Sequence, residues 1–539
     1  MNAKQLVGIV LGIGALLVSP FLPLEGIGLS GQITLGIFVF ASVFWIMEPI
    51  PIYATSMLVI LLQVMLLSSE GFVFAARSAP VVNPILEVVE GREAFILPEE
   101  AVDDGSIYRR VSSKRFSEIE GVETLKAEGG SVWLASDQIA EGMAILSDAG
   151  HRSITGGAYS YSKFYGTLAS PIIMLFLGGF ALAASAVKFG LDRNLTRVLL
   201  RPFGTRPQFV CLGLMMCTGV LSAFMSNTAT TAMMMTVVLP IVGSMAKDDP
   251  FRKAVALAIP VAANIGGIAT PIGTPPNAVA LAALKEAGIS ISFSSWMLMA
   301  TPFSIVLLLI AWRLLLWMFK PKTEKFEIEM QCVFNKSPKA VISYLVFGGT
   351  VLMWITEKVH GISTSMVAFI PVAALPALGV LGKKDIRGFS WEVLWLVGGG
   401  ISLGLSMKDT GLAAWLIGLV SWESFGGVWV IILFGLVGYA LSNLISNTVT
   451  ATMIMPLAIT VGAGLAVSGD FNLVASIVAI TVIVSCSMIL PISTPPNAIA
   501  ISSGAIETKD MSKVGITIGA IGFAISTVCA VTVWPLIIG

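Results

Sequence analysis

Two short groups of polar residues occur twice in this chain at one fixed spacing. Ser226-Asn227-Thr228 returns as Ser446-Asn447-Thr448. Thr274-Pro275-Pro276-Asn277 returns as Thr494-Pro495-Pro496-Asn497, and both returns lie 220 residues further on (446 − 226 and 494 − 274). Hydroxyl and amide oxygens suit a hard cation such as Na⁺, while nearby helix N-termini present about half a positive charge each to an anion. A single copy would be explained by packing between membrane helices, but four matched elements indicate a binding site for small ions.

Two long uncharged stretches carry the Ser-Asn-Thr groups near their middles. Residues 207–246 contain no Asp, Glu, Lys or Arg and have a basic residue at each end, whereas residues 425–469 are uncharged with an acidic residue near each end. Each stretch is long enough to cross a membrane twice, so each is predicted to be a re-entrant helical hairpin. Because basic residues mark the cytoplasmic side, the first hairpin is expected to open inward and the second outward, as inverted repeats require.

The proline pairs are predicted to interrupt two transmembrane helices. Consecutive prolines remove backbone donors and disfavour continuous helix, so 274–277 and 494–497 are expected to be unwound segments whose carbonyls face the hairpin tips. A turn inside a membrane leaves backbone groups without partners unless side chains or bound ions satisfy them. The prolines assigned this structural role are Pro275, Pro276, Pro495 and Pro496.

Composition places the chain in a membrane. A mean hydropathy of +0.89, with 56% hydrophobic and 12% charged residues, excludes a soluble globule, which needs more charge on its surface. Acidic and basic residues are equal in number, 32 each, which gives no reason to expect a nucleic-acid partner. The five cysteines are scattered without metal-binding spacing. The predicted fold class is an all-α polytopic membrane protein, with an uncleaved first helix within residues 6–24.

Lysine and arginine predict the topology. They cluster within residues 188–206, 247–253, 313–339 and 383–387, which are expected to lie in the cytoplasm. Threading the apolar runs between these clusters gives about eleven transmembrane helices plus the two re-entrant hairpins. The N-terminus is then cytoplasmic and the C-terminus extracytoplasmic, in a multi-pass protein of the cell membrane.

One stretch differs in composition from the rest. Residues 70–164 hold 24 of the chain's 64 Asp, Glu, Lys and Arg residues. Matching residues before this stretch, such as Trp45 and Trp354, are 309 apart, whereas those after it are 220 apart, so 89 residues (309 − 220) have been added to the first copy. Strands are predicted at 94–97 and 131–135 and a helix at 138–146, which together make a small soluble α+β insert.

The chain is therefore predicted to have five parts. They are 1–69, the first three transmembrane helices, acting as scaffold; 70–164, the extracytoplasmic insert; 165–320, the rest of the first repeat with the inward hairpin and the first discontinuous helix; 321–340, a cytoplasmic linker; and 341–539, the second inverted repeat with the outward hairpin and the second discontinuous helix.

The repeated motifs resemble those of the divalent anion:sodium symporter family, the group that contains the INDY dicarboxylate and citrate transporters. Phe176-Leu177-Gly178-Gly179-Phe180 also resembles a span of that family, and the resemblance covers nearly all of the chain outside the insert. It implies an elevator-type homodimer, in which a scaffold domain holds the dimer and a transport domain carries both hairpins across the membrane.

The resemblance also implies which residues bind the ions. The first Na⁺ site would use Ser222, Ser226, Asn227 and the carbonyl region at Gly273, and the second would use Ser442, Ser446, Asn447 and Ser493. The substrate carboxylates would be held by Asn227, Thr228, Thr274, Asn447, Thr448 and Thr494. The serine four residues before each Ser-Asn-Thr group is present in both copies, which favours two cation sites.

These observations predict a sodium-coupled secondary active symporter of small divalent anions, C4-dicarboxylates before others, and not an enzyme. Neither hairpin contains Lys or Arg, so helix N-termini and co-bound Na⁺ must offset the anion's charge. The alternatives on the same fold are an anion exchanger and a citrate or sulfate transporter, and coupling to H⁺ instead of Na⁺ stays open. A receptor that senses a ligand through the insert is an alternative of another class, but a sensor does not need duplicated discontinuous helices. The expected partners are the anion, the lipid bilayer and a second copy of the chain, with Na⁺ as coupling ion and no organic cofactor.

Overall fold

The structure is a computed structural model and describes residues 3–24, 26–68, 85–89, 92–96, 124–126, 132–135, 161–322, 334–419, 427–466 and 472–538. Within these residues, nine helices are long and apolar enough to cross a membrane. Four shorter apolar helices of 10–17 residues accompany them. The predicted fold class, an all-α polytopic membrane protein, is confirmed.

The chain divides into two compact units. The first comprises Met1–Leu168 and Gly398–Ser421, and the second comprises Ala169–Val397 and Trp422–Gly539. Two elements, η4 (Thr167–Ala169) and α18 (Trp391–Asp409), contribute residues to both. The other helices of the first unit are α1 (Ala3–Val18), η1 (Ser19–Phe21), α2 (Leu29–Met47), α3 (Ile52–Leu67), α6 (Tyr161–Gly166) and α19 (Leu412–Gly418).

A buried polar cluster joins α3 to the end of α18 in the first unit. The Gln63 amide donates to the Ser406 hydroxyl at 2.7 Å, and the Ser402 hydroxyl donates to Gln63 Oε1 at 2.5 Å. Both ends of this buried amide are therefore satisfied, as a low-dielectric interior requires. Lys163 on α6 forms an ion pair of 2.5 Å with Asp409 at the end of α18. These contacts hold the first unit together although its residues are far apart in sequence.

Four short strands are described within the charged insert. They are β1 (Ile85–Val89), β2 (Arg92–Ile96), β3 (Thr124–Lys126) and β4 (Val132–Ala135). They form one antiparallel sheet in the order β1-β2-β4-β3. The strands predicted at 94–97 and 131–135 correspond to β2 and β4, while the helix predicted at 138–146 lies outside the described residues.

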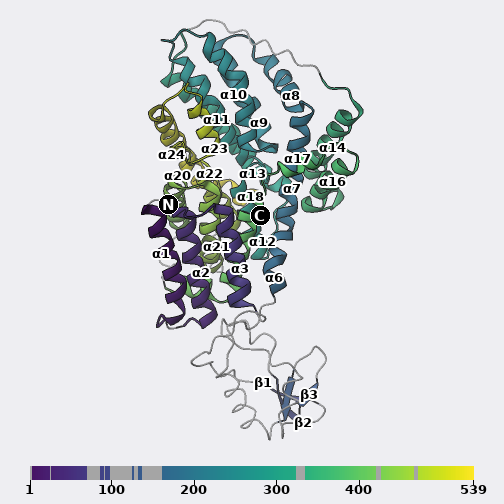
Figure 1. Ribbon diagram of the computed structural model, residues 1–539, viewed down its shortest axis with the longest axis vertical. Coiled ribbons are helices and arrows are strands. Elements are labelled where there is room, and N and C mark those ends of the chain that lie inside the picture. Colours follow the sequence, from purple (N-terminus) through teal and green to yellow (C-terminus); the bar gives the residue numbers. More distant parts are fainter. Residues whose placement is uncertain are drawn as a thin grey trace. The chain divides into compact units, whose positions relative to one another are not determined.

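The second unit contains the two hairpins and the two interrupted helices (Figure 1). Its helices in chain order are α7 (Pro171–Lys188), α8 (Leu191–Leu200), η5 (Arg201–Phe203), α9 (Pro207–Phe224), α10 (Asn227–Ser244), α11 (Phe251–Ile268), α12 (Pro275–Glu286), α13 (Phe293–Met318), α14 (Pro338–Ile355), α15 (Glu357–His360), α16 (Thr364–Ala377), α17 (Lys383–Arg387), α20 (Gly427–Leu444), α21 (Asn447–Ala466), α22 (Leu473–Ser485), α23 (Pro495–Ser502), α24 (Thr508–Thr532) and α25 (Trp534–Ile538).

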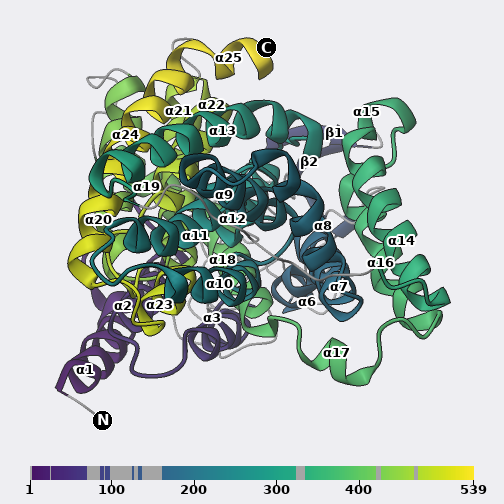
Figure 2. The same cartoon turned by 90° about the horizontal axis from the view of Figure 1, so that it is seen from above.

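Helices α11 and α22 form the centre of the second unit. All 13 residues of α22 and 16 of the 18 residues of α11 are buried, as expected for helices that are apolar on every face. Helix α9 lies beside α11 in both views (Figures 1 and 2). The two backbones are closest at Gly219 and Gly266, where a Cβ on Gly266 would lie 2.4 Å from Gly219 Cα. Only glycine allows this approach.

Glu357 organises the turn between α14 and α16, which lie side by side in Figure 2. Its carboxylate accepts hydrogen bonds from the Thr364 N–H at 3.2 Å and the Thr364 hydroxyl at 2.8 Å. It also accepts one from the Phe293 N–H at 3.1 Å. Thr364 and Phe293 are the first residues of α16 and α13, where unpaired N–H groups favour a negative charge. This carboxylate therefore has a structural role.

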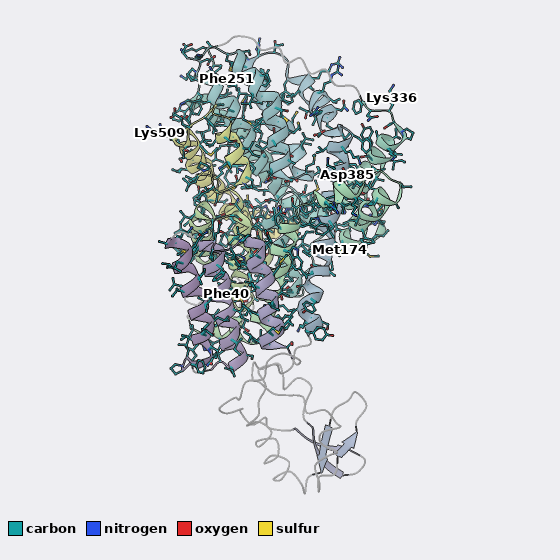
Figure 3. The ribbon with its side chains drawn as sticks, in the orientation of Figure 1. Phe40, Met174, Phe251, Lys336, Asp385 and Lys509 are labelled. Atoms are coloured by element: carbon teal, nitrogen blue, oxygen red, sulfur yellow. The ribbon has the colours of Figure 1, made fainter. Side chains whose placement is uncertain are left out.

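An ion pair joins the end of α7 to the short helix α17, where Figure 3 labels Asp385. Lys188 Nζ lies 2.6 Å from Asp385 Oδ2 and also donates to the Val380 carbonyl at 2.9 Å. Burial acts to raise the pKa of Asp385, but the hydrogen bonds from Lys188 and from the Gly382 N–H outweigh it, so the pKa lies below its usual value. The pair is therefore charged at neutral pH and fixes α17 to α7.

Candidate functional site

Both Ser-Asn-Thr groups lie at the break between the two helices of a hairpin. In the first hairpin, α9 ends at Phe224 and α10 begins at Asn227, with Met225 and Ser226 in extended backbone between them. In the second, α20 ends at Leu444 and α21 begins at Asn447. The hairpins predicted from the uncharged stretches are therefore present, and the polar groups start their second helices.

Each hairpin tip contains the same small cluster of oxygen atoms. In the first, the Ser222 hydroxyl lies 2.5 Å from Asn227 Oδ1 and 2.8 Å from the Ala263 carbonyl oxygen of α11. In the second, the Ser442 hydroxyl lies 2.6 Å from Asn447 Oδ1 and 3.1 Å from the carbonyl oxygen of Val484 in α22. The serines that the sequence assigned to the cation sites are thus brought to the asparagines of the tips.

These clusters suit a cation held by neutral oxygens. Each contains three oxygens and one hydroxyl proton, so the serine can donate fully to only one of its two acceptors at a time. A cation among the oxygens would satisfy all three, and oxygen-only ligands are what hard ions of the Na⁺ type prefer. Among the described residues, no group of three or more His, Cys, Asp or Glu could hold a metal ion.

The helix breaks are real, but they begin earlier than predicted. Helix α11 ends at Ile268 and α22 ends at Ser485, whereas the helices that follow begin at Pro275 and Pro495. The expectation that 274–277 and 494–497 are themselves unwound holds only for Thr274 and Thr494. It is wrong for 275–277 and 495–497, which are helical. Proline lacks the N–H that the first helical position leaves unpaired and has a fixed φ suited to it, so both proline pairs start helices. The unwound segments are 269–274 and 486–494.

The asparagine of each Thr-Pro-Pro-Asn group holds its own break in shape. The Asn277 amide donates to the carbonyls of Ile268 at 3.3 Å and Thr270 at 2.8 Å. The Asn497 amide donates to the carbonyls of Met488 and Leu490, both at 3.0 Å. The acceptors also correspond at the 220-residue offset. Sequence reasoning missed this role, although the repetition of the asparagine was a visible signal.

Two glycines allow the first break to approach the first hairpin tip. A Cβ on Gly267 would lie 2.5 Å from Asn227 Oδ1, and a Cβ on Gly273 would lie 2.4 Å from the Gly267 carbonyl oxygen. Gly273, predicted as part of the first cation site, therefore lies close to Gly267, and Gly267 lies close to Asn227. In addition, the Thr270 hydroxyl donates to the Ala223 carbonyl at the end of α9.

The second break is tied to its hairpin in a different way. Ser493, predicted as a cation ligand, donates from its hydroxyl to the Asn443 carbonyl at 3.1 Å. Asn443 Oδ1 accepts from the Ile489 N–H at 2.9 Å. Ser493 is therefore brought to α20 one turn before Asn447, and no direct bond between Ser493 and Asn447 is present among the described residues.

The remaining predicted residues differ in exposure. Thr274 and Thr494 are 6% and 5% exposed, at the starts of α12 and α23. Thr228, in the first turn of α10, is exposed, and Thr448, in the first turn of α21, is partly buried. Ser446 accepts a hydrogen bond from the Val449 N–H at 3.3 Å, whereas Ser226 makes no side-chain cap bond to α10.

The two repeats exchange their half-helices. Helix α12, which follows the first break, packs on α21 and α22, and α23, which follows the second, packs on α10 and α11. Each half-helix therefore lies in contact with the other repeat, and its N-terminus is the end next to the break. Unpaired N–H groups give such N-termini a partial positive charge that favours anions. Residues 207–246 and 427–466 carry no charged side chain, so neither hairpin itself offers an anion a basic side chain.

Comparison with known proteins identifies the family. The model of the family described as "Sodium:sulfate symporter transmembrane region" matches residues 143–539. The chain is 31% identical over 407 residues to the sodium-dependent dicarboxylate transporter SdcS of Staphylococcus saprophyticus, covering 68% of this chain and 77% of that protein. It is 30% identical over 420 residues to an uncharacterized transporter of Haemophilus influenzae, covering 72% of this chain and 87% of that one.

The structure also has a likeness to the YdaH transporter of Alcanivorax borkumensis, with a TM-score of 0.48, 13% identity, and coverage of 77% of this chain and 94% of that chain. The match of the family description to well over half of the chain is the finding that assigns it, together with relatives of 30% identity or more along two thirds of its length. The protein is therefore a member of the divalent anion:sodium symporter family.

Proposed function

We propose that this sodium-coupled transporter carries small divalent anions together with Na⁺. C4-dicarboxylates are the first candidates for the anion. The observation that carries the proposal is the pair of matched oxygen clusters, Ser222 with Asn227 and Ser442 with Asn447, at the tips of two hairpins without charged side chains. The name of the staphylococcal relatives supports a dicarboxylate as the anion. Sulfate is the second candidate, because it is the anion in the description of the matching family region.

Electrostatics explains why anion and cation would travel together. A dianion at the hairpin tips meets no Lys or Arg from either hairpin, and a helix N-terminus offers only about half a unit of positive charge. Two bound Na⁺ ions would supply the missing charge. The anion is therefore expected to bind weakly until Na⁺ is present. The site is expected to cross the membrane either with both the anion and Na⁺ bound or with neither bound.

The arrangement of the second unit supports an elevator mechanism. Both hairpins and both interrupted helices belong to this single compact unit, so all the proposed ion ligands can move as one body. In the proposed mechanism this body crosses the membrane within a homodimer. The first three helices (1–69) act as scaffold, and the insert (70–164) lies outside the cell.

Uptake into proteoliposomes tests the function. Purified full-length protein is expected to accumulate labelled succinate when an inward Na⁺ gradient is the only driving force, and not with K⁺ or a pH gradient alone. Uptake of labelled citrate and sulfate is measured in the same way, and the three rates show which anion is preferred. Equal uptake with and without the Na⁺ gradient would contradict symport and favour exchange, and H⁺-driven uptake would contradict the cation assignment.

Replacing the tip serines tests the cation sites. Ser226→Ala and Ser446→Ala each remove one proposed Na⁺ ligand, so each is expected to raise the Na⁺ concentration for half-maximal uptake about ten-fold. The matched control is Ser244→Ala, at the exposed far end of α10, where the hydroxyl bonds only to its own helix. If the Na⁺ dependence of both tip variants equals that of the control, the serines are not ligands.

A further inference from the structure

Asn264 connects the first repeat to the substrate contacts of the second. It lies in α11, is 3% exposed, and its amide donates to the Thr494 hydroxyl at 3.1 Å and to Asn497 Oδ1 at 3.2 Å. At the 220-residue offset its counterpart is Val484, which has no polar group in its side chain. Because the repeat does not supply this asparagine twice, the two halves of the site differ here.

The hydrogen-bond network fixes the direction of each amide. The Asn497 amide faces two backbone carbonyls, those of Met488 and Leu490, which only accept, so its nitrogen must point to them. Its oxygen then faces Asn264. Asn264 must consequently present its nitrogen, and the same nitrogen reaches Thr494. No other assignment satisfies all four contacts.

This network leaves only the proton of the Thr494 hydroxyl available for a further hydrogen bond. A hydroxyl has two acceptor lone pairs and one proton. Thr494 Oγ1 accepts from the Asn497 N–H at 3.4 Å and from the Asn264 amide at 3.1 Å, so both lone pairs are engaged. The proton remains, and a hydroxyl in this state can only donate. A carboxylate, which only accepts when ionised, is the complementary partner.

The corresponding hydroxyl of the first repeat has no such constraint. With valine at 484, Asn277 Oδ1 is buried without a hydrogen-bond partner among the described residues. The Thr274 side chain likewise accepts no cap bond from the start of α12. Thr274 can therefore turn its hydroxyl to donate or to accept.

We propose that Asn264 is a positioning residue that commits the Thr494 hydroxyl to donating a hydrogen bond to a substrate carboxylate. The two matched threonines are then unequal: Thr494 is a dedicated anion contact, and Thr274 is an adaptable one. This inference rests on the proposed function, because it assigns a role within the same anion site. It predicts that anion affinity depends on a residue that does not itself touch the anion.

The experiment measures Na⁺-dependent binding of labelled succinate to the purified full-length transporter. Asn264→Leu keeps the side-chain shape but removes the donor, and is expected to weaken succinate binding about ten-fold, as is Thr494→Val. Because Asn264 acts through Thr494, the double variant is expected to bind no more weakly than Thr494→Val alone. Thr494→Ser keeps the hydroxyl and is expected to bind succinate more tightly than Thr494→Val.

Two controls separate this role from a general loss of structure. Asn194→Leu removes another buried amide of the same unit, one that bonds only to the Gly190 carbonyl of its own turn, and is expected to leave succinate affinity unchanged. Thr274→Val is expected to weaken binding less than Thr494→Val, and this comparison does not depend on whether Asn264→Leu folds.

The outcomes separate the inference from the function. Wild-type protein without Na⁺-dependent binding of succinate or of sulfate would contradict the proposed function. Wild-type protein that binds succinate, combined with unchanged affinity in Asn264→Leu or with independent, additive losses in the double variant, would overturn the inference alone. Equal losses in Thr274→Val and Thr494→Val would overturn it as well.

Discussion

Asn447→Asp is expected to weaken succinate binding about a thousand-fold while Na⁺ binding is kept. The substitution places a full negative charge at a hairpin tip where the proposed anion has no basic side chain from either hairpin to meet. Two like charges about 4 Å apart repel by about 4 kcal/mol at an effective dielectric constant of 20, and each 1.4 kcal/mol is a factor of ten. The same charge attracts Na⁺, because Asn447 Oδ1 already lies in the oxygen cluster of Ser442. Equilibrium binding of labelled succinate and of Na⁺ measures the two effects separately.

The same change elsewhere in the second repeat gives the control. Asn472 caps α22 and accepts a hydrogen bond from the Ala475 N–H at 3.0 Å, a place where Asp serves equally well. It lies 12 residues before Val484, which is about 18 Å along a helix. Asn472→Asp is expected to leave succinate affinity within about two-fold. Normal succinate affinity in Asn447→Asp would show that this asparagine does not face the anion.

The uncharged stretches and the repeated motifs were enough to predict where the two hairpins turn. The uncharged stretches predicted both hairpins, and the Ser-Asn-Thr groups were expected at their tips, where Asn227 and Asn447 begin the second helices. Ser222 and Ser442, which the resemblance assigns to the cation sites, lie beside those asparagines. This success has a physical reason: a helix break within a membrane needs polar partners, and such residues are conspicuous in apolar sequence.

The exact position of the helix breaks could not be read from the prolines. A proline pair disfavours helix in the residues before it and suits the first turn of a helix, so a pair marks the end of a break and says little about its start. The starts depend on contacts. By the 220-residue offset α22 should end at residue 488, but it ends at Ser485, and the Asn443 side chain accepts the Ile489 N–H that follows. The counterpart of Asn443 is Ala223, which has no such group.

Residues that differ between the two repeats could not be recognised by comparing the repeats for matching residues. The close crossing at Gly219 and Gly266 has no second copy, because the corresponding residues are Tyr439 and Cys486. Asn264, which bonds to Thr494, corresponds to Val484. A residue without a partner in the other repeat looks like ordinary variation in sequence. It becomes informative only when the structure shows what it contacts.

Gly267→Ala is expected to raise the Na⁺ concentration for half-maximal succinate binding by about ten- to a hundred-fold. The new Cβ would lie 2.5 Å from Asn227 Oδ1 and 2.8 Å from Asn227 Nδ2, closer than atoms can approach. Asn227 has little freedom to move aside, because its oxygen is held at 2.5 Å from the Ser222 hydroxyl. Displacing it costs the strain of an overpacked core, about 1–3 kcal/mol, and breaks up the first oxygen cluster. Succinate binding measured over a Na⁺ titration reports the change.

Gly179→Ala is the matched control for the added methyl group. Gly179 is buried in α7 of the same unit, but its Cβ would lie 3.5 Å from the nearest carbon of Ile272, an ordinary contact. Its Na⁺ titration is expected to match that of the wild type, and an unchanged titration in Gly267→Ala would show that Asn227 is not a cation ligand. The second repeat has Ser487 at the corresponding position, where the hydroxyl donates to the Tyr439 carbonyl at 3.3 Å. Glycine is thus required only beside the first oxygen cluster. Gly267→Ala should therefore disable one cation site and leave the Ser442–Asn447 cluster able to bind Na⁺.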